Sequence, residues 1–429
     1  MKTGIISQLC AEVRLPRMFK VRQMFDQTRI EPTAIPEAVF AELSKPELSA
    51  PIRAGMRVAI TCGSRGVANV AIITKAIADF VKAQGAAPFV IPAMGSHGGA
   101  TAKGQRQLIE GYGVTEEFVG CPIVSSMETV VIGQSEEGHS VRIDRNAAEA
   151  DAIIVAGRVK PHTDFRGPYE SGIMKMMAIG LGKREGADFC HAEGFAAMAK
   201  RVPLFGRCII KNAPIALGFA ILENAYCQTW KFVALRPDEI ATKEPALLEE
   251  ARTHLPLILF SETDVLVVDR IGKDISGDGM DPNITGASTC SPCVSGGLKA
   301  QRTAILDLTP ATHGAAFGIG AAHTITRRLF NQIDYEATYV NAITSRGIDF
   351  ARIPCIVEND REAIQLALRT CVGYDADRPR IIRIADSLHT ETIWVSEALR
   401  QEAEASPRLN ILSGPEDWAF NAQGNLFND

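Results

Sequence analysis

The segment KPHTDFRGPYESGIMK at residues 160–175 places a histidine, a glycine-containing turn and a lysine close together in the chain. Lys175 is followed at once by the apolar run MMAIG. Burial among apolar side chains lowers the pKa of a lysine toward the neutral amine, which is a nucleophile that forms covalent links. Further on, His191 stands among small and apolar neighbours in GADFCHAEGF, where a neutral imidazole is a common metal ligand. These residue types predict covalent and metal chemistry.

Elements that could bring such residues together follow from the alternation of short apolar segments with longer amphipathic ones, which predicts a largely parallel α/β sheet. The expected strands are 57–62, 87–94 and 151–159, and the expected helices are 67–85, which stops at Gly85, and 101–113, which Thr101 opens. A second α/β unit follows. Its expected strands are 261–272, 303–309 and 380–387, with a Gly- and Ala-rich helical region at 313–333 and an amphipathic helix at 359–371 capped by Asn359 or Asp360.

The ends of the first three expected strands carry reactive side chains. Arg65 lies in CGSRG, His97 in GSHGG and His162 in VKPHTD. Because ligands in open α/β sheets bind beyond the carboxyl ends of the strands, we expect these three loops to share one site.

Composition excludes several classes of protein. The 429 residues carry a formal net charge of -5, which disfavours a nucleic-acid partner, and no apolar run is long enough for a membrane span. The N-terminus lacks a signal-peptide pattern, so we expect a cytoplasmic protein. Ten irregularly spaced cysteines fit reduced core thiols, although Cys290 and Cys293 form a CxxC that leaves a zinc or redox role open.

These residues resemble the nickel-dependent lactate racemase family, whose members hold a nickel-pincer nucleotide. The resemblance is carried by Arg65, by His97 in GSHGG, by His162 in KPHTD, and by SGIMK with His191 after it. It spans most of the first half of the chain. By this resemblance, Lys175 carries the cofactor, pyridinium-3,5-bisthiocarboxylic acid mononucleotide nickel, through a thioamide link.

The resemblance also implies roles for the other residues. His191 would complete the nickel coordination, His97 and His162 would act as acid and base on opposite faces of the substrate, and Arg65 would orient the substrate carboxylate. Ser171 and Gly172 of the SGIMK motif would lie against the cofactor. In GLGK, the residues Gly180, Gly182 and Lys183 are candidates for contact with the nucleotide phosphate.

The implied reaction racemises or epimerises a 2-hydroxy acid. Hydride moves to the cofactor while a histidine removes the hydroxyl proton, a transient 2-keto acid forms, and hydride returns to the opposite face. The implied partners are a small-molecule 2-hydroxy acid and the enzymes that make the cofactor.

The chain departs from the family pattern in ways that bear on the substrate. Ile173 and Met174 replace the residues that usually follow the serine and glycine, and Cys62 stands where an aspartate usually precedes the arginine. In the second half, Lys273 and Lys299 are candidates for the substrate-binding lysine. We therefore expect a divergent homologue, and substrates other than lactate remain open.

The expected architecture is two α/β domains with largely parallel sheets, the first Rossmann-like, and an active site in the cleft between them. The boundaries are 1–268 for the domain with the cofactor and histidines, 269–395 for a domain that closes over the site, and 396–429 for a C-terminal helix or tail packing back on the first domain.

Two other functions stay open, and several further residues have a structural rather than a catalytic interpretation. His97, His162 and His191 could instead hold zinc in a hydrolase, or the scaffold could be a catalytically silent small-molecule binder. In the loop KDISGDGMDPNITG, the residues Asp274, Asp278 and Asp281 lack the EF-hand order, which favours a functional or domain-crossing loop. His313 and His323 are interpreted as structural or substrate-adjacent. Asp164 and Glu170 are interpreted as solvated loop residues, although a carboxylate that orients His162 would be useful.

Overall fold

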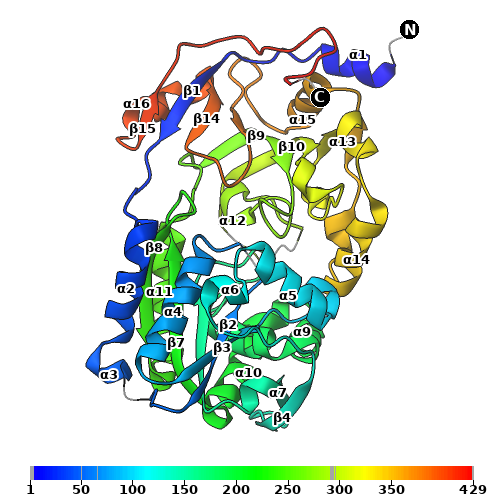
Figure 1. Ribbon diagram of the computed structural model, residues 1–429. Coiled ribbons are helices and arrows are strands. Elements are labelled where there is room, and N and C mark those ends of the chain that lie inside the picture. The colour runs from blue at the N-terminus through cyan, green and yellow to red at the C-terminus, as the bar shows by residue number, and fades with distance from the viewer. Residues whose placement is uncertain (1–3, 50, 65, 290–293, 295, 428–429) are drawn as a thin grey trace. The chain divides into compact units, whose positions relative to one another are not determined.

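The chain forms two compact units in a computed structural model that describes residues 4–49, 51–64, 66–289, 294 and 296–427 (Figure 1). Unit I is Gln27–His254, and unit II combines Met1–Asp26 with Leu255–Asp429. This division differs from the domain boundaries expected at 268 and 395. The first expected boundary falls inside strand β9 (Glu262–Ile271), and the N-terminal segment belongs to the unit formed by the second half of the chain.

Unit I is built on a five-stranded sheet in the order β3-β2-β6-β7-β8. Its strands are β2 (Arg57–Cys62), β3 (Ala87–Pro92), β6 (Ala152–Arg158), β7 (Ile215–Glu223) and β8 (Thr229–Leu235). The first four run parallel, and β8 pairs antiparallel with β7. The three strands expected in this half are therefore confirmed. They are buried almost throughout, as expected for parallel strands covered on both faces.

The strand order of unit I creates a position for a ligand. The chain passes from β2 to β3 on one side of the sheet and then returns to β6 on the other side of β2. Neighbouring connections therefore diverge at the carboxyl ends of β2 and β6, and such switch points are where open α/β sheets bind ligands.

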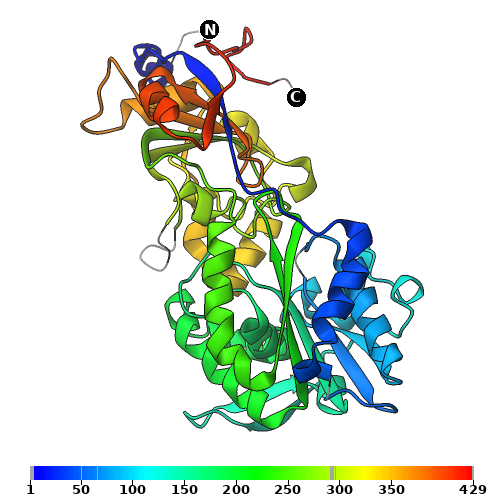
Figure 2. The same ribbon diagram turned by 90° about the vertical axis from the view of Figure 1, so that its left-hand side faces the viewer.

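Helices cover both faces of this sheet (Figure 2). α2 (Ile35–Leu43) and α4 (Val70–Ala83) pack on one face, and α10 (Met198–Asn212) and α11 (Pro237–Thr253) pack on the other. The helices expected at 67–85 and 101–113 are confirmed as α4 and α5 (Ala102–Gly111). The Thr101 hydroxyl accepts a hydrogen bond from the Gly104 N–H at 3.0 Å, so it caps α5 as expected.

The other helices and strands of unit I are α3 (Pro46–Ser49), α6 (Glu116–Val119), the hairpin β4 (Thr129–Gln134) and β5 (Ser140–Asp144), α7 (Arg145–Ala148), α8 (Ile173–Lys175) and α9 (Lys183–His191).

Unit II contains an eight-stranded sheet in the order β12-β11-β10-β9-β13-β14-β1-β15. Its parallel part is β9, β10 (Lys299–Leu308), β11 (Thr324–Thr326), β12 (Cys355–Val357) and β13 (Ile381–Ile384). Its antiparallel part is β14 (Thr392–Ser396), β1 (Met18–Gln23) and β15 (Leu409–Ile411). The strands expected near 261–272, 303–309 and 380–387 are confirmed. The helices are α1 (Ile5–Ala11), α12 (Pro282–Thr285), α13 (Arg327–Asn331), α14 (Tyr335–Ser345), α15 (Asp360–Arg369) and α16 (Arg400–Ala405).

One expected element of unit II is wrong. The region 313–333 is not a helix, because it contains the strand β11 and reaches helical structure again only in short segments such as α13. Gly314 and Gly318 adopt positive φ angles of 77° and 99°, which a helix excludes. By contrast, α15 begins as expected, with the Asn359 side chain accepting from the Glu362 N–H at 2.9 Å.

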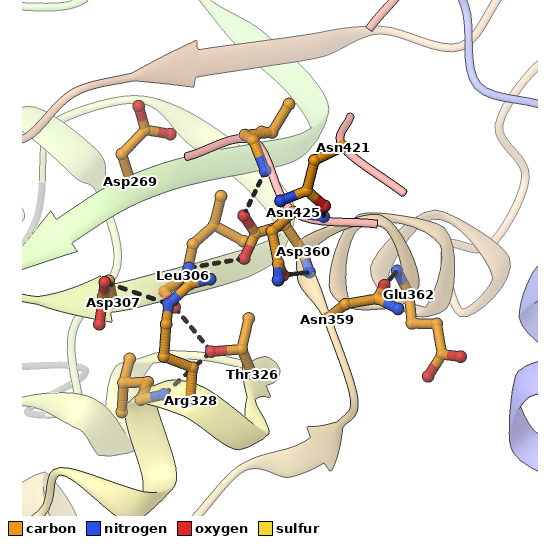
Figure 3. Close-up of polar contacts among 12 residues, drawn as sticks. Asp269, Leu306, Asp307, Thr326, Arg328, Asn359, Asp360, Glu362, Asn421 and Asn425 are labelled. Carbon is orange, nitrogen blue, oxygen red and sulfur yellow. Dashed lines mark hydrogen bonds and ion pairs between the residues drawn. The ribbon is translucent and has the colours of Figure 1, made fainter. Parts of the chain in front are cut away.

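The C-terminal residues pack within unit II. Trp418, Phe420, Leu426 and Phe427 lie against the apolar cluster that α15 shares with the sheet. Figure 3 shows how polar contacts hold this segment: Asp360 accepts from the Leu426 N–H at 2.8 Å and also pairs with Arg328 at 2.8 Å. The expected tail at 396–429 is therefore partly ordinary structure of this unit, including α16 and β15.

Two general features bear on the sequence expectations. No described helix has the length and apolar character needed to cross a membrane. The described cysteines carry thiols rather than disulfides, and the buried ones are Cys10, Cys62, Cys121, Cys190, Cys208 and Cys371. Cys290 and Cys293 lie outside the described residues.

Candidate active site

The three loops expected at the strand ends of unit I leave the same edge of the sheet, because β3, β2 and β6 are adjacent and parallel. Side chains link the loops to one another. Ser64 Oγ, after β2, lies 2.5 Å from His97 Nδ1, after β3. Arg158, at the end of β6, donates to the Gly66 carbonyl at 3.2 Å. Arg65 itself lies outside the described residues.

His97 is exposed on a tight loop whose backbone is fixed from below. The buried Gln105 side chain donates to the Gly95 carbonyl at 2.8 Å and to the His97 carbonyl at 3.3 Å. Gly98, at φ +64°, packs so closely on α5 that a Cβ there would lie 2.6 Å from the Gln105 nitrogen. Gly98 of GSHGG therefore permits the close packing that presents His97 at the sheet edge.

Lys183 supports this loop from inside the protein. Its side chain is fully buried, and its ammonium donates to the Pro92 carbonyl at 2.5 Å and to Gln105 at 3.2 Å, and pairs with Asp144 at 3.1 Å. Burial lowers the pKa of Lys183, and Asp144 partly offsets that effect. A contact between Lys183 and a nucleotide phosphate would require these bonds to break.

The two glycines of GLGK are closely packed against backbone carbonyls. A Cβ on Gly180 would lie 2.8 Å from the Ala93 carbonyl oxygen, and one on Gly182 would overlap the Ala178 carbonyl. A phosphate contact by these glycines stays a prediction.

The helical segment that carries Lys175 and His191 bends back on itself. α8 is followed by a π-helical stretch, Met176–Leu181, and then by α9, whose first residue, Lys183, has a left-handed φ of 51°. Because Gly182 and Gly186 lack side chains, α9 packs closely on the Ala178 carbonyl. The turn brings His191 into electrostatic range of Lys175.

The loop from Lys160 to Ser171 is closed at its base. The two residues exchange backbone hydrogen bonds of 3.0 and 3.1 Å. Inside the loop, the Glu170 carboxylate accepts from the His162 N–H at 2.7 Å and from Arg252 of α11 at 3.1 Å. These bonds fix the backbone of His162 relative to the sheet edge.

Side chains of two segments, the 160–171 loop and α8, meet at Phe165. The His162 ring lies 4.5 Å from the Phe165 ring, centre to centre, and the Lys175 ammonium lies 5.7 Å from the centre of the same ring. Lys175 is partly buried, as the apolar run after it predicts. His162 and Lys175 are therefore brought together around one aromatic side chain.

His191 has the properties of a neutral ligand. Its Nδ1 lies 2.8 Å from the Ala187 carbonyl oxygen, which can only accept, so Nδ1 carries the proton and Nε2 keeps its lone pair. Burial lowers the pKa of His191, and the nearby Lys175 charge lowers it further. The arrangement fits a single imidazole nitrogen offered to a metal.

The interpretation of Asp164 and Glu170 as solvated loop residues is wrong. Their exposed fractions are 6% and 1%, and each contacts His162 or its backbone. A short loop with a histidine and two acidic residues could have signalled this, because carboxylates often orient catalytic imidazoles.

Among the described residues, no group of three His, Cys, Asp or Glu side chains is placed to hold a metal ion. His97, His162 and His191 are all described, and they do not form the ligand set that the zinc alternative requires.

Comparisons with known proteins show which family the sequence and the fold resemble. Residues 10–201 match the family model described as the lactate racemase N-terminal domain. The first half of the chain is therefore similar in sequence to the N-terminal domain of lactate racemases. The lactate racemase apoprotein from Thermoanaerobacterium thermosaccharolyticum shares its fold, with a TM-score of 0.54 and 13% sequence identity over 85% of this chain and 93% of that chain. No curated protein shows a significant sequence match.

The matched region includes His97, His162, Lys175 and His191. At Cys62, where the family resemblance leads us to expect an aspartate, burial raises the pKa of the thiol to about 12. The side chain of Cys62 is therefore uncharged, unlike an aspartate.

One buried carboxylate beside the SGIMK motif could not be identified from the sequence. Glu244 of α11, which is fully buried, accepts from the Met174 N–H at 3.0 Å and so caps the helix that carries Lys175. A Cβ on Gly172 would overlap Glu244 Oε1, which explains the glycine in SGIMK. No local pattern links residue 244 to this motif.

The two candidate lysines of unit II lie far apart. Lys273 follows the carboxyl end of β9, and Lys299 begins β10 opposite Glu262. Because the strands are parallel and about 30 Å long, the two lysines lie at opposite edges of the sheet, and one small substrate cannot contact both. The carboxyl edge is where such sheets bind ligands, which favours Lys273.

Other candidates of unit II have structural partners. Asp281 caps α12 through the Asn283 N–H at 2.9 Å, and Asp274 accepts from the Thr309 hydroxyl at 2.5 Å. His323 accepts from the Thr303 N–H at 3.0 Å, as expected for a structural histidine.

Proposed function

We propose that this protein racemises or epimerises a 2-hydroxy acid by proton-coupled hydride transfer, using a nickel-pincer nucleotide linked to Lys175. The observation that carries the proposal is the meeting of His162 and Lys175 at Phe165, with the neutral His191 in electrostatic range. A nucleophilic lysine, a ligating imidazole and an acid-base imidazole are the three residue types that this chemistry needs in one place.

The residues fit the cofactor in their chemistry. Lys175 would hold it covalently, His191 would offer Nε2 to nickel, and Ser171 and Gly172 precede the tether. Since the other nickel ligands belong to the nucleotide, one histidine suffices. When bound, the cofactor supplies a hydride acceptor.

The chain's own residues would bind the substrate and move its proton. Arg65 would hold the substrate carboxylate, and Lys273 or Lys299 would add a second contact. His162 and His97, on opposite faces, would each take the hydroxyl proton from one enantiomer and return a proton to the other. Phe165 would keep water from His162 and Lys175.

A lysine variant tests the proposal. Protein produced together with cofactor-making enzymes should contain nickel, show a mass increase on the peptide that includes Lys175, and racemise at least one member of a 2-hydroxy acid panel. Lys175→Ala should lose the adduct, the nickel and the activity. The control Lys200→Ala removes an exposed lysine that pairs with Glu137 and should keep all three.

The outcomes separate the alternatives. Racemisation by protein whose Lys175 peptide has its unmodified mass would contradict the proposal. Hydrolysis that persists in Lys175→Ala would favour the hydrolase, and an adduct without turnover of any panel member would favour a silent binder.

A further inference from the structure

Asp164 contacts His162 in two different ways. Its backbone N–H donates to His162 Nδ1 at 3.0 Å. Its carboxylate oxygen Oδ2 lies 3.6 Å from the same nitrogen. Because Nδ1 accepts the backbone hydrogen bond, the proton of the neutral ring sits on Nε2.

The Asp164 carboxylate is buried and incompletely satisfied. Oδ2 accepts from the Thr163 hydroxyl at 3.0 Å, while Oδ1 has no hydrogen-bond partner among the described residues. A buried carboxylate oxygen without a donor is costly, so a donor that arrives during the reaction would stabilise it.

His162 needs different partners at Nδ1 in its resting tautomer and in its reacting form. With the proton on Nε2, Nδ1 is an acceptor. For Nε2 to take a proton, Nδ1 must carry one, and a backbone N–H cannot accept it. The carboxylate can, if its distance from Nδ1 closes from 3.6 Å by about 1 Å to charge-assisted hydrogen-bond length.

We propose that Asp164 is a positioning residue that supplies both partners: its N–H holds Nδ1 when Nε2 carries the proton, and its carboxylate holds Nδ1–H when Nε2 accepts one. The inference rests on the proposed function, since His162 can take the hydroxyl proton at Nε2 only from the form in which Nδ1 carries the ring proton. Before the accepting step the ring gives its Nε2 proton to water and takes one from water at Nδ1. The substrate O–H bond then breaks, the Nε2–H bond forms, and the positive charge of the ring is balanced by Asp164.

Other charged groups near His162 act elsewhere. Glu170 accepts from the His162 N–H, and Arg166 donates to the His162 carbonyl at 2.7 Å. Arg252 reaches the loop through Glu170, and Lys175 lies over Phe165. These groups hold the backbone or contact a neighbouring ring, whereas Asp164 reaches Nδ1.

The test uses the full-length protein without cofactor. Histidines labelled with ¹³C in the ring are followed by NMR against pH, and His162 is assigned with His162→Gln. In the wild type, neutral His162 should be the Nε2–H tautomer. In Asp164→Asn, which keeps the backbone N–H, His162 should protonate at a pH lower by about one unit, because the carboxylate no longer stabilises the charged ring.

Two controls isolate the carboxylate. Asp188→Asn removes an exposed carboxylate of α9, paired with Arg184, and should leave the His162 titration unchanged. Asp164→Ala also keeps the backbone N–H and should reproduce the shift. Thermal midpoints within a few degrees of the wild type would establish that the variants are folded.

An unchanged His162 titration in Asp164→Asn, or an Nδ1–H tautomer in the neutral wild type, would overturn the inference. With the cofactor loaded, Asp164→Asn should lose about tenfold or more in kcat with little change in KM. If the NMR result is as expected but the loaded wild type racemises no 2-hydroxy acid, the proposed function fails while the pairing stands.

Discussion

The buried carboxyl group of Glu244 caps the helix that carries Lys175, the residue proposed to hold the cofactor, and its protonation depends on pH. It caps α8 from a fully buried position, and its Oε1 has no hydrogen-bond partner among the described residues. Burial raises the pKa of Glu244 to about 7, and the Met174 and Ile173 N–H groups only partly offset it.

This pKa predicts how stability depends on pH. Below about pH 4.5 Glu244 is protonated in both states, so its contribution to stability is complete. As pH rises to about 7, the unfolded chain ionises first and stability falls. Glu244→Gln stays neutral, so it should gain up to about 3 kcal/mol of unfolding free energy relative to the wild type across this window. Urea unfolding at pH 4 to 8 measures the difference, and a difference that does not vary with pH would contradict the assignment.

At the level of residues, the sequence predicts groups whose neighbours in the chain reveal them. Lys175 precedes an apolar run, and His97 and His162 follow strands. Glu244 could not be predicted, because its partners are N–H groups of residues about 70 positions earlier. For Asp164 and Glu170 the local signal is that two acidic residues share a short loop with a histidine, and this does not reveal that the loop folds over their side chains.

At the level of elements, Lys183 joins three parts of unit I. Its ammonium contacts the end of β3, α5 and the end of β5, while its left-handed backbone sets the start of α9. The loop of His97 and the helix of His191 are therefore positioned by one buried side chain.

Lys183→Met should destabilise the protein by about 3 to 5 kcal/mol, because Asp144 would be left buried without its cation. Adding Asp144→Asn should recover part of this loss. Chemical denaturation measures both effects, with Lys103→Met on the exposed side of α5 as the control. Full stability of Lys183→Met combined with loss of nucleotide binding would instead support the phosphate contact.

Strands and capped helices could be predicted because their signals are local. The segment RVAITC is mostly apolar and forms β2, and Asn359 caps α15. The composition of 313–333 predicts a helix wrongly, because alanine and glycine have opposite effects on a helix. Alanine favours a helix, whereas Gly314 and Gly318 take backbone angles that end one.

At the level of the whole molecule, the C-terminal segment is part of the core of unit II. Arg328 bridges Asp307 and Asp360, and the Phe427 ring lies 4.6 Å from its guanidinium carbon. The C-terminal segment thus covers part of the apolar cluster that α15 shares with the sheet.

Asp360→Ala should release this segment, because the Leu426 N–H loses its acceptor and Arg328 loses a buried partner. We expect a loss of about 3 to 5 kcal/mol in unfolding free energy and faster cleavage near residue 420 in limited proteolysis. Asp377→Ala, at an exposed site, is the control. If the C-terminal segment of Asp360→Ala is cleaved no faster than that of the control, this role for Asp360 is wrong.

The extent of the units could not be predicted, because it depends on pairings across almost the whole chain. Val21 of β1 pairs with Ile393 and Ile411, and no periodicity within residues 18–23 shows this. An expected boundary at 268 followed the local pattern and cut through β9.

The placement of β1 has a consequence for synthesis on the ribosome. Unit I is continuous in sequence and can begin to fold while the chain is still being made. β1 emerges early, but its partners at residues 392–396 and 409–411 are translated near the end. The earliest strand must therefore wait, unpaired, for almost four hundred residues, and a chaperone that shields Phe19 and Val21 during translation would raise the yield of correctly assembled protein.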